Sequence, residues 1–170
     1  MRRIGSRVAD RRRRREAVVK IMTAILGVLV VATAPASAQR TWCWSFAGSG
    51  VSARGTIVTG NAADKDGFYR IVGITGRANS ASVTALQPVG TSVSGNSGYP
   101  VDNLIRQTEP QLTKHGVGFL ASDGTYHNPY HSGQYRDYIS RRPYADGKGA
   151  EPTIKFKAVP AAAGSRCSTD

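Results

Sequence analysis

Helix signals, catalytic motifs and acidic residues are all scarce in this 170-residue sequence. Neither a G-x-S-x-G nor an H-E-x-x-H pattern occurs, so the motifs typical of α/β-hydrolases and of zinc metalloproteases are missing. Its 11 Asp and Glu residues are scattered, and a glycosidase pair of carboxylates would have to arise through the fold alone. These absences favour a non-catalytic protein, and we assign no catalytic residue, no metal and no cofactor.

Long hydrophobic runs are also lacking, with one exception near the N-terminus. The run "IMTAILGVLVVATA" follows an arginine-rich start and precedes "PASA", an arrangement typical of a secretory signal peptide. We therefore predict a signal peptide over residues 1–38, cleaved after Ala38. The run is shorter than the ~20 residues of a membrane span, although an uncleaved anchor is the alternative, and the choice between Sec and twin-arginine export stays open.

Removal of this segment changes the charge of the chain. Residues 1–38 carry nine of the 23 basic and two of the 11 acidic residues, which leaves 14 basic and nine acidic residues and a net charge of +5 in place of +12. The basic balance is thus largely a targeting feature, and no run of Arg and Lys remains to indicate nucleic-acid binding. We expect an exported protein, periplasmic or extracellular, without a membrane span after cleavage and without a nucleic-acid partner.

Cysteine is limited to two residues, Cys43 and Cys167. An even number of cysteines in an exported chain predicts a disulfide between them, with two free thiols as the alternative.

The remaining 132 residues alternate between apolar and polar positions and are interrupted by Gly, Ser and Asn-rich turns. This pattern predicts an all-β protein, a small antiparallel sandwich or barrel of about seven short strands. "TWCWSF" should direct Trp42, Trp44 and Phe46 to the core, and together with "GFYRIVGITG" it should form the centre of the sheet. We expect a single β-rich domain over residues 39–170, with a loose tail from about residue 160.

The segment 89–110 has neither a helical nor a strand period. We predict a long surface loop with a short ordered piece at "VDNLI", and loops of this length are often functional.

The densest cluster of polar side chains is "HNPYHSGQYRDYIS" at residues 127–140. Pro129 disfavours a helix, so we predict a β-hairpin that turns near Ser132 and Gly133. Residues four apart in a strand are separated by ~13 Å, and His127 and His131 are therefore expected to be solvated or hydrogen-bonded rather than to share a metal. The tyrosines of this region are candidates for an aromatic binding surface, with core packing as the alternative; they are Tyr126, Tyr130, Tyr135 and Tyr138.

Five segments occur in a recognisable order: "WSFAGSGVSARGTIVTG", "GFYRIVGITGRANSASVTAL", "YPVDNLI", "GVGFLAS" and "YRDYIS". Over residues 42–140 they resemble a small all-β domain of exported bacterial proteins of the PEP-CTERM type. The resemblance implies fold and export, and no particular reaction. The sequence ends "GSRCSTD" without the Pro-Glu-Pro sorting motif of that family, so we do not expect surface anchoring by that route.

Two functions follow as hypotheses. The first is a structural or binding module for a surface glycan or an envelope protein, using the 89–110 loop and the tyrosine hairpin. The second is a small secreted hydrolase, which requires a concave site where a histidine meets a carboxylate. Its candidate residues are His115, His127 and His131 with Asp123 or Asp137.

Overall fold

The computed structural model describes residues 39–141, 149–162, 165 and 167. The chain divides into two compact units after Pro35, and all described residues belong to the second. The predicted signal peptide and part of the predicted tail lie outside the described residues. Nine strands are described: β1 Arg40–Gly48, β2 Val51–Ala63, β3 Tyr69–Ala78, β4 Ala81–Leu86, β5 Leu104–Ile105, β6 Phe119–Ala121, β7 Thr125–His131, β8 Tyr135–Arg141 and β9 Lys155–Pro160. Helices are absent from this part of the chain, so it holds none long and apolar enough to cross a membrane.

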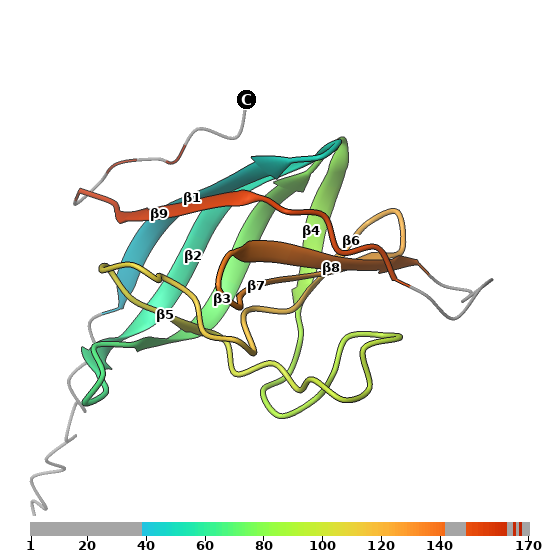
Figure 1. Ribbon diagram of the computed structural model, residues 1–170. Helices are drawn as coiled ribbons and strands as arrows, with labels where there is room; N and C mark the ends of the chain where they lie inside the picture. Colours follow the sequence, from blue (N-terminus) through green and yellow to red (C-terminus); the bar gives the residue numbers. More distant parts are fainter. Residues whose placement is uncertain (1–38, 142–148, 163–164, 166, 168–170) are drawn as a thin grey trace, which may run out of the picture. The chain divides into compact units, whose positions relative to one another are not determined.

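The strands form one antiparallel sheet in the order β8-β7-β6-β4-β3-β2-β1-β9, with β5 paired to β3 off this path. The sheet curls into a half-barrel (Figure 1). Residues just before β9 pair with β8 through the bridges Arg136–Thr153 and Ile139–Ala150, which brings the two ends of the sheet together. The prediction of an all-β antiparallel sandwich or barrel is therefore confirmed.

The first strand supplies the centre of the core. Trp42, Trp44 and Phe46 are at most 3% exposed, as the alternating pattern predicted. Both indole groups also donate hydrogen bonds, Trp42 Nε1 to Thr59 Oγ1 at 3.1 Å and Trp44 Nε1 to Thr75 O at 3.3 Å. The expectation that β1 and β3 together form the middle of the sheet is wrong, because β2 separates them and β1 lies next to the end strand β9.

The long segment between β4 and β5 covers the face of the β7–β8 hairpin that is turned away from this core. Val93 and Val101 from this segment pack against Tyr138 and form a second, smaller core with it. Asn103, which has a φ of +51°, fastens the segment by donating from Nδ2 to Gln87 O at 2.7 Å and accepting at Oδ1 from Gly118 N at 3.1 Å. The short ordered piece predicted at "VDNLI" is β5.

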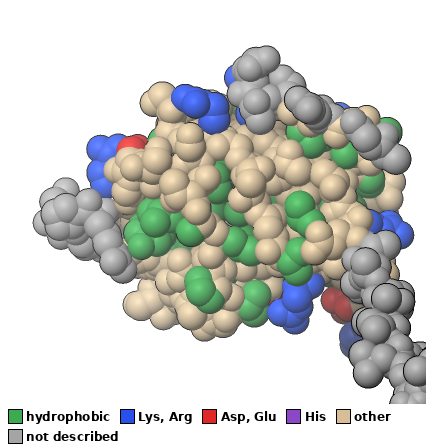
Figure 2. Space-filling model, turned by 180° about the vertical axis from the view of Figure 1, so that it is seen from behind, with side chains coloured by type: hydrophobic (Ala, Val, Ile, Leu, Met, Phe, Trp, Pro, Cys, Tyr) green, Lys and Arg blue, Asp and Glu red, His purple; other side chains and the backbone are tan. Residues whose placement is uncertain are grey.

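The two cysteines are bonded to each other. Cys43 of β1 and Cys167 of the tail have Cα atoms 5.2 Å apart and their sulfurs are within bonding distance, so the predicted disulfide is confirmed. Hydrophobic side chains on the face of the molecule drawn in Figure 2 occur in small separate groups.

Candidate binding site

Residues 125–141 form the predicted hairpin, with its turn between His131 and Tyr135. Gly133 in the turn has a φ of +73°, a conformation that glycine adopts without strain. Pro129 lies opposite Asp137, whose N–H donates away from β7, to Pro152 O at 3.1 Å. The pair is therefore one that exchanges no ladder hydrogen bond, and Pro129 costs the hairpin no donor.

Alternation along β7 separates the side chains into two sets. His127 and Pro129 are buried towards the main core, whereas Tyr126, Asn128 and Tyr130 are turned towards the segment that joins β4 and β5. Asn128 is 1% exposed. Its Nδ2 donates to His115 O at 3.0 Å and to Val117 O at 3.4 Å.

The four predicted binding tyrosines do not form one platform. Tyr138 is 6% exposed and belongs to the second core, with Tyr126 and Tyr130 half-buried against it. Tyr135 is on the opposite face, where its ring lies 5.6 Å from that of Phe156. Tyr138 is therefore a core residue, which was the alternative to a binding role.

Tyr130 nevertheless takes part in a cavity of about 380 Å³ between the hairpin and the 89–110 loop, which we call the tyrosine cavity. Asn96, Gly98, Tyr99, Lys114, His115, Asn128, Tyr130, Ser132 and Glu151 line it. Sequence analysis missed Tyr99, which is 61% exposed and is the most exposed large hydrophobic side chain of the described residues. Its signals in the sequence were its place in a long loop and its position at the start of "YPVDNLI".

Two titratable side chains in or near this cavity, Tyr130 and Asp102, have raised pKa values. Burial, followed by the nearby charge of Glu151, raises the pKa of Tyr130. Beside it, Thr113 Oγ1 donates to Asp102 Oδ2 at 2.6 Å and accepts from the backbone N–H groups of His115 and Gly116. Burial raises the pKa of Asp102. The cavity thus presents one exposed ring, a fixed amide and side chains of both charge signs.

One histidine of the hairpin does meet a carboxylate. His127 Nδ1 lies 2.6 Å from Asp137 Oδ2, and both side chains are almost fully buried. The imidazole stacks on Phe119 with centroids 5.0 Å apart and an interplanar angle of 15°. Burial raises the pKa of Asp137, and its Oδ1 has no hydrogen-bond partner within the described part of the chain.

His127 also lines a recess of about 660 Å³, together with Ser49, Asp123 and Ser140. This is the contact in a concave site that the hydrolase hypothesis requires. Asp123, which lines the same recess, forms an ion pair with Arg141 at 2.9 Å, and His131 packs edge-on against Tyr135 at 4.9 Å. The described residues include no group of three His, Cys, Asp or Glu side chains able to hold a metal ion.

Comparisons with protein-family models, with curated proteins and with solved structures give no significant match.

Proposed function

We propose that this protein is an exported, non-catalytic module that binds a glycan of the bacterial surface in the tyrosine cavity. The observation that carries the proposal is the exposed ring of Tyr99, which shares one cavity with the polar side chains of Ser132 and Glu151. Sugars are bound by such sites, because their C–H faces pack on aromatic rings while their hydroxyl groups need both donors and acceptors.

The neighbouring side chains supply those donors and acceptors. Asn96 and Ser132 can donate, and Glu151, which already accepts from the phenol of Tyr130, has a second carboxylate oxygen that can accept. Tyr130 lies on β7, and Asn96 lies on the segment that packs against the hairpin, so binding would require little reorganisation. The Cys43–Cys167 disulfide supports export, since disulfides persist in oxidising compartments such as the periplasm and the medium.

The test is an array of immobilised mono- to tetrasaccharides probed with the purified protein, followed by titration of each sugar retained. Tyr99→Ala and Asn96→Ala should each weaken binding about tenfold, the effect of one lost stacking or hydrogen-bonding contact. Val72→Ala is the matched control, because Val72 is 50% exposed on β3 and lies outside the cavity. Retention that survives both cavity variants, or no retention at all, would refute the proposal.

Hydrolysis is a second candidate, favoured by the contact between His127 and Asp137. A carboxylate on Nδ1 orients an imidazole so that Nε2 can accept a proton from a nucleophile, and His127 lines the recess that would admit a substrate. The measurement is release of p-nitrophenol from p-nitrophenyl acetate. The candidate predicts turnover that His127→Gln abolishes and His131→Gln preserves, and a wild-type rate equal to that of buffer would exclude this esterase activity.

A further inference from the structure

The strand register gathers basic side chains that are far apart in the sequence. Arg77 of β3 pairs with Arg54 of β2, Arg54 pairs with Ser45 of β1, and Ser45 pairs with Lys157 of β9. These four residues form one row across four adjacent strands, on the face opposite the tryptophans. With neighbouring strands ~4.8 Å apart, the row spans roughly 14 Å. Lys155 lies two residues from Lys157 on the same side of β9.

We call the surface formed by Arg54, Arg77, Lys155 and Lys157 the cationic face. Strands β1, β2, β3 and β9 contain no Asp or Glu. Among the described residues, the carboxylates in contact with a basic side chain are Asp137, with His127, and Asp123, with Arg141. All four cations are exposed, and the positive charge of this face is therefore not neutralised by a described carboxylate.

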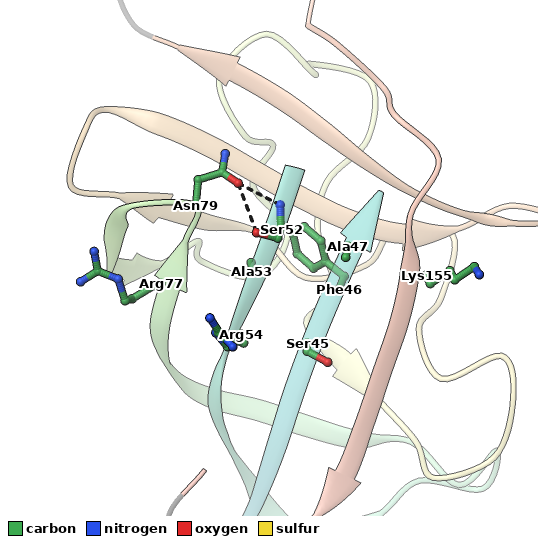
Figure 3. A pocket seen from close by; sticks show the side chains of 9 residues that line it. All are labelled: Ser45, Phe46, Ala47, Ser52, Ala53, Arg54, Arg77, Asn79 and Lys155. Atoms are coloured by element: carbon green, nitrogen blue, oxygen red, sulfur yellow. Dashed lines mark hydrogen bonds between the residues drawn. The ribbon is translucent and has the colours of Figure 1, made fainter. Parts of the chain in front are cut away.

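A groove of about 600 Å³ runs over this face, lined by three of the cations and by polar side chains that include Ser45, Ser52 and Asn79. Figure 3 shows Arg77, Arg54, Ser45 and Lys155 on adjacent strands, with Asn79 and Ser52 joined by hydrogen bonds at one end. Asn79 Oδ1 accepts from Ser52 N at 2.9 Å, which fixes that end of the groove. The groove thus offers charge together with hydroxyl and amide groups.

We propose that the cationic face binds an acidic polysaccharide that carries carboxylate groups, laid across β3, β2, β1 and β9. Charge complementarity selects a polyanion. An extended sugar chain can place carboxylates against Arg77, Arg54 and Lys157, with a hydroxyl group against Ser45 between the last two. The serine and asparagine side chains are suited to its hydroxyl groups.

Nucleic acid fits this face less well. Proteins that bind single strands stack the bases on aromatic rings, and the aromatic residues Trp42, Trp44 and Phe46 of β1 are all turned inwards. The outward residues of β1 and β2 are Thr, Cys, Ser, Ala, Arg and Val. The proposal does not depend on the tyrosine cavity, which is built from other segments.

The test titrates the purified protein with polygalacturonate and with dextran, a neutral polymer of matched length, at low and at physiological salt. The double substitution Arg54→Gln with Lys157→Gln should weaken polygalacturonate binding about tenfold. The matched control is Lys65→Gln with Arg70→Gln, which removes the same charge from exposed residues outside the cationic face. It should change the Kd less than twofold, and thermal melts should show all variants folded.

Three outcomes would overturn the assignment. Equal losses in the two double variants would mean that only net charge matters. Tighter binding of duplex or single-stranded DNA, or of phosphatidylglycerol vesicles, with the same dependence on Arg54 and Lys157, would assign the face to that partner instead. Equal affinities for polygalacturonate and dextran would show that the charge of the polymer does not contribute to binding. None of these outcomes bears on Tyr99→Ala, so failure here is distinguishable from failure of the proposed function.

Discussion

Single glycine residues set how closely two strands of the sheet approach. Gly55 of β2 lies opposite Gly76 of β3 and, on its other side, opposite Trp44 of β1. A Cβ atom added to Gly55 would come within 2.0 Å of Thr75 O, which is a backbone atom and also the acceptor of the Trp44 indole. No side chain fits there without moving β3.

The first prediction therefore concerns Gly55. Gly55→Ala should lower the free energy of unfolding by about 2–3 kcal/mol, because the added methyl group overpacks a site bounded by backbone. Gly60→Ala on the same strand is the control, since a Cβ there meets no atom within 4 Å; its change should stay within ~0.5 kcal/mol. Urea denaturation compares the two, and equal midpoints would contradict this account of the glycine pair.

The second prediction concerns the phenol of Tyr135. Burial, followed by the hydrogen bond to Glu109, raises the pKa of Tyr135 from 10.0 to about 12. A raised folded-state pKa stabilises the protein fully below the unfolded value, and this contribution is lost as pH rises from 10 through about 12. After allowance for solvent screening it should amount to ~1 kcal/mol.

Ultraviolet difference titration of wild type against Tyr135→Phe isolates this group. The missing tyrosinate signal should be centred near pH 12, and Glu109→Gln should move it towards 10. A centre at pH 10 in the wild-type protein would show that neither the burial of Tyr135 nor its hydrogen bond to Glu109 persists in solution.

The two histidines of the β7–β8 hairpin lie in different environments. His127 is 3% exposed, stacks on Phe119 and bonds to Asp137, whereas His131 is half-buried near the turn. The third prediction is that His127→Ala costs about 3 kcal/mol, because it leaves the Asp137 carboxylate buried without its partner. His131→Ala, the control, should cost less than ~1 kcal/mol.

Replacing both members of the pair separates the two causes of that loss. In His127→Phe with Asp137→Leu no buried charge is left unpaired, and much of the stability should return, as it does when apolar side chains replace other buried ion pairs. Thermal melts of the three variants measure this. Equal costs for His127→Ala and His131→Ala would mean that the pair contributes nothing to the hairpin.

The strands were largely predictable from the sequence, because alternation over "TWCWSF" and the turn residues of the hairpin are local signals. The register between strands could not be predicted from the sequence. The row from Arg77 to Lys157 depends on which residues face each other, and the irregularity between Val58 and Thr59 resets the pairing of β2 with β3. The tyrosine cavity likewise depends on where a loop of low local order packs, so the loop and Tyr130 were anticipated but Tyr99 was not.

At the scale of the whole molecule, the half-barrel depends on how its last strand is held. β9 pairs only with β1 along the sheet order, and the bridges to β8 precede it. Just beyond β9, Ala161 N donates to Thr41 O at 2.8 Å, and Cys167 is bonded to Cys43. The disulfide thus fastens the chain that follows the last strand to the outer face of β1.

The fourth prediction follows from the length of the loop that this bond closes. The two cysteines are 124 residues apart in the sequence, and restricting the unfolded chain by so long a loop contributes roughly 4–5 kcal/mol on the chain-entropy model. Measured gains usually fall short of the model, so Cys43→Ser with Cys167→Ser should lower the free energy of unfolding by ~3 kcal/mol. Because hydrogen bonds still pair β9 with β1, the double variant should remain folded. Guanidinium denaturation with and without dithiothreitol measures the loss. The reductant should destabilise the wild-type protein by the same amount and leave the stability of the double variant unchanged. A wild-type midpoint insensitive to the reductant would show that the disulfide does not stabilise the half-barrel.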